Sequence, residues 1–189
     1  MKPIFNIVFK RLRSSGLAGN ASCAGTWKKL LALQRDLNEE ICWELLTTHL
    51  PWLINNELIT GDEIRSWFSI AELNARHIYT KGSHAVRDGF AIGLGEVTLE
   101  ASGHSKIILF EKAFCAARDT SFVTGFHNSF LIVTNCFGYT YHHSKAIARN
   151  YARVEAHDES FVKAEDHSYI IRHNNATVER AGTSKAIVL

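Results

Sequence analysis

The sequence predicts a mainly β protein, a parallel β-solenoid of octapeptide repeats with two octads in each coil, preceded by a small α-helical region. Three observations lead to this fold class. The chain repeats with a period of eight from Gly89 onward, residues of different character alternate inside each octad, and turn-forming residues recur at one fixed position. We therefore expect a basic, flexible N-terminal segment at 1–25, a helical head at 26–82 and a β-solenoid at 83–189.

Length and composition are those of a folded chain. Its 189 residues are 46% hydrophobic and 21% charged, which is enough for one core. A net charge of +2 gives no direct signal for nucleic acid or for a membrane surface. Four cysteines without C-x-x-C spacing support neither a disulfide framework nor a zinc finger, so we expect a cytoplasmic protein. No apolar run approaches the ~20 residues that span a bilayer.

The N-terminal segment has some features of a signal peptide. Its apolar stretch at 3–9 is short, contains Asn6 and runs into a basic cluster at 10–13, which is the wrong flank for cleavage. Residues 20–23, Asn-Ala-Ser-Cys, are similar to a lipoprotein cleavage site but lack its aliphatic residue. Residues 14–25 are small and polar, as in a linker. We therefore expect no export.

A helical pattern follows the linker. Apolar residues recur at three- and four-residue steps from Trp27 to Leu45, which is the period of an amphipathic helix. We expect Thr26 to cap this helix and the helix to end before Pro51.

Two capping boxes predict two further short helices. Thr60-x-x-Glu63 and Ser69-x-x-Glu72 each pair a hydroxyl with a carboxylate three residues later, so we expect helices near 62–68 and 70–76. The stretch at 58–64, Leu-Ile-Thr-Gly-Asp-Glu-Ile, resembles the turn of SHOCT-like short helical hairpins. That resemblance implies a module attached to another domain and involved in association.

Each odd position of the octad has its own character. Octads begin at 89, 97, 105, 113, 121, 129 and 137 and, after one seven-residue step, at 144, 152, 160, 168, 176 and 184. Position one is mostly small, position three aliphatic, position five small or aliphatic, and position seven mostly Gly, Asn or Asp. Positions one, three and five therefore face inward, and position seven makes a corner. An antiparallel sandwich also alternates, but it has no reason to keep this register.

The outward positions indicate how many octads close a coil. With two octads to a coil, one sheet collects the apolar residues, whereas three octads would spread them over all faces. This apolar outer sheet consists of Phe90, Ile92, Leu94, Ile108, Phe110, Phe122 and Phe126. An apolar patch of this size is typical of an interface. We expect the helical head to cover it; the alternative is that a partner binds it.

Two octads carry a resemblance to a known group. Ala152-Arg-Val-Glu-Ala-His-Asp-Glu and Ser160-Phe-Val-Lys-Ala-Glu-Asp-His look like the A-x-V-x-A-x-D/G-x repeats of uncharacterised phage and mobile-element β-helix proteins. In that group, too, a short helical head precedes the repeats, and the likeness covers roughly residues 58–189. The group carries no established activity to transfer. The resemblance suggests a phage product, and action on a host complex is our own hypothesis.

Ten histidines raise the question of a metal site. His142, His157 and His173 fall at position six on successive coils of one sheet, with Glu155 and Asp158 nearby. Imidazoles ~5 Å apart can share Zn²⁺ or Cu²⁺, but structural zinc takes four closed ligands. We therefore expect exposed stacking of the three rings, with no metal and no cofactor.

The sequence contains no recognisable catalytic constellation. The repeat already explains residues such as Ser160 and Asp166, and no glycine-rich phosphate loop precedes a helix. We expect a non-enzymatic protein-binding or blocking protein, a phage-encoded inhibitor of a host defence complex, whose partner is a protein or a host nucleoprotein complex. A metal-dependent enzyme that uses the histidine column is the least favoured alternative.

The other alternative is a structural module that dimerises through the solenoid end. The last coil leaves backbone groups unpaired along one edge, and only Lys185 could blunt that edge. We expect a homodimer. The dimer edge consists of Ser184, Ala186, Ile187, Val188 and Leu189.

Overall fold

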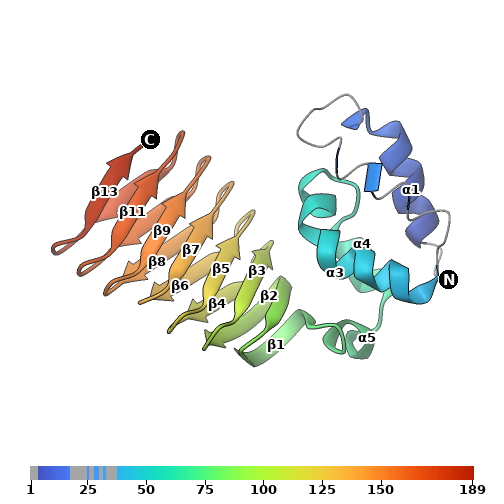
Figure 1. Ribbon diagram of the computed structural model, residues 1–189, viewed down its shortest axis with the longest axis horizontal. Helices are drawn as coiled ribbons and strands as arrows, with labels where there is room; N and C mark the ends of the chain where they lie inside the picture. The colour runs from blue at the N-terminus through green and yellow to red at the C-terminus, as the bar shows by residue number, and fades with distance from the viewer. Residues whose placement is uncertain (1–3, 18–24, 26–27, 30–31, 33–37) are drawn as a thin grey trace. The chain divides into compact units, whose positions relative to one another are not determined.

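The computed structural model describes residues 4–17, 25, 28–29, 32 and 38–189. The chain divides into two compact units, a helical unit at Met1–Glu72 and a β unit at Leu73–Leu189 (Figure 1). The boundary lies before the predicted one at 83, because the first strand of the β unit already begins at Ile78.

Helix α1, Ile4–Ser14, corrects the expectation of a flexible N-terminal segment over these residues; residues 1–3 and 18–24 of the predicted segment at 1–25 lie outside the described residues. Its apolar residues recur at three- and four-residue steps and are buried: Ile4, Phe5, Val8, Phe9 and Leu12. Arg11 anchors the helix, because its guanidinium donates to both carboxylate oxygens of Glu63 at 2.8 and 2.6 Å. Arg11, in the basic cluster that resembles the end of a signal sequence, is therefore part of the packing of the helical unit, whereas Lys10 and Arg13 are exposed.

Helix α3, Glu39–Asn55, begins and ends differently from the predicted helix. Its N-cap is Asn38, whose side chain accepts from the backbone N–H of Ile41 at 2.9 Å. It also continues through Pro51, so the predicted end is wrong. The proline removes one helical hydrogen bond, but apolar residues on both sides of it are buried and keep the helix in place. The predicted cap Thr26 and Trp27 lie outside the described residues.

Helices α4, Gly61–Trp67, and α5, Ile70–Asn74, confirm the two short helices. Thr60 and Glu63 form the predicted capping box at the start of α4. Ser69 and Glu72 exchange the same pair of bonds at the start of α5, at 2.8 and 3.3 Å. Each helix therefore begins where its hydroxyl and carboxylate satisfy free backbone donors.

The β unit is the predicted parallel β-solenoid, with about seven turns. After β1, Ile78–Arg87, and β2, Phe90–Ser102, each later octad forms one short strand. These strands are β3 Lys106–Phe110, β4 Phe114–Ala117, β5 Phe122–Gly125, β6 Phe130–Thr134, β7 Phe137–Thr140, β8 Lys145–Arg149, β9 Arg153–Ala156, β10 Phe161–Ala164, β11 Tyr169–Arg172, β12 Thr177–Arg180 and β13 Lys185–Val188. The stack of coils runs from β1 to β13 in Figure 1.

Strand pairing confirms two octads to a coil. The ladders are parallel, in the order β12-β10-β8-β6-β4-β2-β3-β5-β7-β9-β11-β13. Strand β2 spans two octads and pairs with both β3 and β4, and from β3 onward the ladders join alternate strands. We call the arm from the first half of β2 through β3 to β13 sheet A, and the arm from its second half through β4 to β12 sheet B. An antiparallel sandwich is thereby excluded. Since β1 pairs with both halves of β2, the solenoid begins one coil before Gly89.

The core of the solenoid is thin. Position three is filled by aliphatic residues such as Ile107, Val123 and Val162, none of which is exposed. Small residues must face large ones across this core. A Cβ on Gly125 would lie 2.4 Å from a methyl group of Leu131, so sheet A has no side chain where a leucine from sheet B fills the space. The inward small–large–small register is therefore confirmed.

Position seven makes the corners in a left-handed conformation. The described residues there have φ between 50° and 92°, which Gly, Asn and Asp tolerate best. They are Gly95, Gly103, Glu111, Asp119, His127, Asn135, His142, Asn150, Asp158, Asp166, Asn174 and Gly182. Several of their side chains also join coils: Asp158 accepts from the His142 N–H at 3.0 Å, and Asp166 from the Asn150 N–H at 3.1 Å.

One octad is placed a residue too late in the prediction. The seven-residue octad runs over 129–135, and the next begins at Cys136 rather than at 137. Cys136, Gly138 and Thr140 are buried, whereas Phe137 is 52% exposed. The physical reason is the thin core, which accepts the small residues of this segment and turns its aromatic residues outward.

Candidate binding face on sheet A

The predicted apolar residues lie on the outer face of sheet A, but the exposed aromatic residues of this face are others. Among the predicted residues, Ile92, Leu94 and Phe110 are buried. The other four are half-buried: Phe90, Ile108, Phe122 and Phe126. The predicted residues do lie on one sheet at outward positions, as expected, but none of them is fully exposed.

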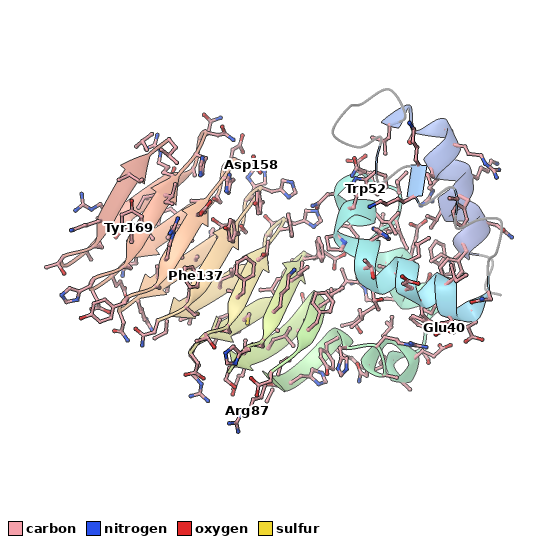
Figure 2. The ribbon with its side chains drawn as sticks, in the orientation of Figure 1. Glu40, Trp52, Arg87, Phe137, Asp158 and Tyr169 are labelled. Carbon is pink, nitrogen blue, oxygen red and sulfur yellow. The ribbon has the colours of Figure 1, made fainter. Side chains whose placement is uncertain are left out.

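The exposed aromatic surface is centred on Phe137 in β7. Position two of sheet A places Phe122 and Phe137 on adjacent strands. Tyr139, at position four of the same octad, has its ring centroid 5.1 Å from that of Phe122. Figure 2 labels Phe137 and, two coils further along the same sheet, Tyr169. The register error at 135–136 hides this group in the sequence, because it places Phe137 and Tyr139 in the core.

A continuous stack of rings runs along position six of sheet A. The centroid separations are 5.2 Å from Phe110 to Phe126, 5.0 Å to Tyr141, 4.6 Å to His157 and 4.3 Å to His173, with interplanar angles between 3° and 13°. Parallel strands in register bring identical positions to this spacing. We call this set the ring ladder.

The structure brings together two of the three predicted histidines. His157 and His173 are neighbours in the ring ladder, as predicted. His142 is not in the ladder, because the octad at 136 puts it at position seven, on the corner. There its ring stacks on His127 at 5.3 Å and its Nδ1 accepts the His127 N–H at 3.3 Å. Tyr141 takes the place predicted for His142.

A carboxylate faces the two stacked histidines. Glu155 precedes His157 by two residues, so both side chains point outward from sheet A. Glu155 Oε2 lies 4.0 Å from His157 Nε2 and 3.8 Å from His173 Nε2. The three side chains are 20–25% exposed. Burial lowers the pKa of His157 below 6.5, and the neighbouring His173 lowers it further, against the opposite effects of Glu155 and Asp158.

Charged residues flank the aromatic surface. Arg153, at position two beside Phe137, lies with its guanidinium 6.0 Å from the Tyr169 ring centroid and 3.5 Å from Glu155 Oε1. Sheet A therefore combines aromatic rings, a guanidinium and a carboxylate on one flat face.

Two surface hollows lie outside this face. One, of about 590 Å³, follows the corner next to sheet A and is lined by His142, His143, Asp158, Glu159, Asn174 and Asn175. Figure 2 labels Asp158 at this corner. The other, of about 250 Å³, lies on sheet B and includes Glu100, Arg118 and Thr134. The first is lined by polar residues, whereas alanines and Ile132 make the lining of the second mainly apolar. Neither contains a residue of the predicted apolar surface.

The predicted dimer edge is the outer strand of sheet A. Among the described strands, β13 pairs with β11 alone. Ser184 is buried and Ala186 half-buried, whereas Ile187, Val188 and Leu189 are exposed. The edge is therefore apolar as predicted, and its association stays a prediction.

Fold and surface together define a parallel two-sheet β-solenoid with an aromatic outer face. Comparisons with protein-family models, curated proteins and solved structures give no match to this chain. The resemblance to phage octapeptide-repeat proteins therefore stays a prediction. Among the described residues, no helix has both the length and the apolar character needed to cross a bilayer.

Proposed function

We propose that this protein is a non-enzymatic binding protein whose outer face of sheet A docks on a macromolecular partner. The observation that carries the proposal is the exposure of Phe137, 52% of whose surface is open, next to the half-buried Phe122 and Tyr139. Exposed aromatic residues that lie side by side on a monomer are typical of interaction sites.

The composition and rigidity of the face favour a protein partner. Tyrosine, tryptophan and arginine are the residues that contribute most to protein–protein affinity, and the aromatic surface is bordered by Arg153 and Tyr169. These side chains stand on hydrogen-bonded parallel strands, so little conformational entropy is lost when a partner binds. The outer face of a sheet suits a broad contact with a macromolecule better than it suits a small molecule, which usually binds in a concave site.

We propose further that binding blocks the partner. The resemblance of the octads to phage β-helix repeats supports a host protein or nucleoprotein complex, such as a defence complex, as the target. A rigid solenoid can act by occupying a surface that the complex needs, and this mode of action requires no catalytic group.

The test compares two exposed aromatic positions. Partners are captured from host cells by cross-linking with three proteins: the unmodified chain, Phe137→Arg and Tyr151→Arg. Tyr151 is the matched control because it is 74% exposed but lies beside the corner, outside sheet A. We expect Phe137→Arg to lose the partner that the other two retain, with circular dichroism equal in all three. Equal capture by all three variants would show that sheet A is not the binding face.

The second candidate function is self-association. It is supported by the outer edge of β13. No described strand pairs with this edge, which carries the exposed Ile187, Val188 and Leu189. Edge-to-edge pairing of two copies through a two-fold axis would satisfy these strands. Sedimentation of the chain is expected to show a dimer at micromolar concentration that Ile187→Lys dissociates. A monomer would refute this function, and a dimer unaffected by the substitution would place the contact elsewhere.

A further inference from the structure

We propose that Glu155, His157 and His173 form a binding site for a divalent transition-metal ion such as Zn²⁺ on the outer face of sheet A. The proposal is independent of the binding function above, because it rests on the donor atoms and their surroundings alone. One carboxylate oxygen and two imidazole nitrogens of these residues all lie within 4.8 Å of one another.

The backbone brings the three donors together without a special loop. Glu155 and His157 occupy positions four and six of one octad, so both point outward. His173 occupies position six one coil later, and the β9–β11 ladder is in register up to the residue before each histidine, with Ala156 opposite Arg172. The site is therefore held by hydrogen-bonded strands, which keep metal ligands in place better than loops do.

Two of the donor atoms lack a partner. Nε2 of His157 and Nε2 of His173 are buried and have no hydrogen-bond partner among the described residues. Their separations from Glu155 Oε2, 4.0 and 3.8 Å, are too long for hydrogen bonds. A buried polar atom without a partner calls for an explanation such as an ion or a water, and of the eight such side-chain atoms among the described residues these two lie near one carboxylate oxygen. Both atoms face the same carboxylate oxygen, which favours a cation.

The second oxygen of the carboxylate is already engaged. Glu155 Oε1 lies 3.4 Å from the Tyr139 hydroxyl, which donates to it, and 3.5 Å from the Arg153 guanidinium. These contacts orient the carboxylate and leave Oε2 directed at the imidazoles. Metal-binding carboxylates are commonly held by such outer hydrogen bonds.

The donor set suits zinc in an open site. Two histidines and one glutamate, with a fourth position left for water, are a known combination for Zn²⁺. Donors about 2.1 Å from a tetrahedral ion lie about 3.4 Å apart, so binding requires the partly exposed side chains to rotate and each donor to move by roughly 1 Å.

The structure provides a matched control. His143 Nδ1 lies 3.2 Å from Glu159 Oε2, and both side chains are more than 60% exposed. This pair has the same chemistry, one histidine and one glutamate, but no third donor from the described part of the chain lies within 4.8 Å of both. Its contribution to metal binding should therefore be negligible.

The experiment titrates the untagged chain with Zn²⁺ by calorimetry and with Co²⁺ by visible absorption. We expect one ion per chain, with affinity reduced about tenfold or more in His157→Gln, in His173→Gln and in Glu155→Gln, and unchanged in His143→Gln. Absence of binding, equal binding in all variants, or a thiolate charge-transfer band from Co²⁺ would each overturn the proposal.

A second measurement follows metal binding in the unmodified chain, and a double variant serves only to assign the signals that move. Nitrogen-15 spectra of the histidine side chains are recorded with and without Zn²⁺. We expect the Nε2 signals of two histidines to move together at one equivalent, and the same two signals to be missing in a double His157→Gln, His173→Gln variant. Movement of other signals instead would place the metal elsewhere.

Discussion

Replacement of Asp158 by alanine is expected to destabilise the solenoid by about 3 kcal/mol. Asp158 occupies a corner with φ of 58°, and its Oδ2 accepts the backbone N–H of His142 at 3.0 Å. A hydrogen bond to a charged acceptor contributes about 1.5–3 kcal/mol, with the lower value suited to a half-exposed group. The left-handed backbone costs alanine about 1–2 kcal/mol. The two effects add because alanine supplies neither the acceptor nor the conformational tolerance.

Two further variants separate these effects. Asp158→Gly keeps the backbone freedom but loses the acceptor, so we expect a cost of about 1.5 kcal/mol. Asp158→Asn keeps both an acceptor oxygen and tolerance of the left-handed region, so we expect a change below about 1 kcal/mol.

Thermal unfolding followed by β-sheet circular dichroism provides the assay. A loss of about 3 kcal/mol lowers Tm by roughly 10 °C in a unit of this size. Tryptophan fluorescence reports the helical unit at the same time, because all four tryptophans lie before residue 73. Equal melting of the alanine and asparagine variants would refute the account of the corners.

Three other predictions concern the core, the histidines and the helical unit. Val162→Asp should cost about 4 kcal/mol or more, because it buries an unpaired carboxylate among apolar contacts. Lys163→Asp, on the outer face, should have a much smaller effect. Comparable losses of stability in urea denaturation would mean that inner and outer faces are exchanged. Since the pKa of His157 is lowered on folding, the unfolded chain binds more protons, and the free energy of unfolding should fall as pH drops below the ordinary histidine pKa of about 6.5. His157→Gln should reduce this pH dependence. An unchanged slope of the free energy of unfolding between about pH 5.5 and pH 7.5, on either side of that value, would contradict the prediction. Arg11→Ala should destabilise the helical unit by about 1 kcal/mol, since it removes the partly exposed ion pair with Glu63; an unchanged tryptophan-fluorescence transition would show that this pair contributes nothing.

The parts of the fold that depend on local patterns could be predicted from the sequence. Left-handed corners favour Gly, Asn or Asp, and this preference is visible within the octads although Glu111, His127 and His142 also adopt the conformation. Capping boxes need only four consecutive residues, as at Thr60 and Glu63. Helix α1 has a local signal as well, because Ile4, Val8 and Leu12 recur at helical steps. It was missed because its basic residues resemble the flank of a signal peptide. Only the partner of Arg11, Glu63, lies far along the chain.

The candidate site depended on a single residue of register. The pairing of His157 with His173 followed from the period of eight, since both lie after the seven-residue octad. His142 lies at the junction, where Asn135 and Cys136 allow two placements of the next octad. The choice between them depends on which side chains fit the thin core. Only the structure decides it, because it shows Cys136, Gly138 and Thr140 buried. The same shift hid Phe137.

The seven-residue octad at 129–135 indicates where this repeat tolerates changes of length. Asn135 keeps the corner conformation, with φ of 57°, and the chain then continues directly with the inward Cys136, so the residue that is missing is the one at position eight. Both neighbouring ladders remain in register across this coil, with Phe122 opposite Phe137 and Phe130 opposite Lys145. A deletion at any strand position would exchange inner and outer faces for the rest of that strand. The octad therefore tolerates a change of length at position eight without a change of strand register. Insertions or deletions that survive during the evolution of such repeats should accumulate at that position.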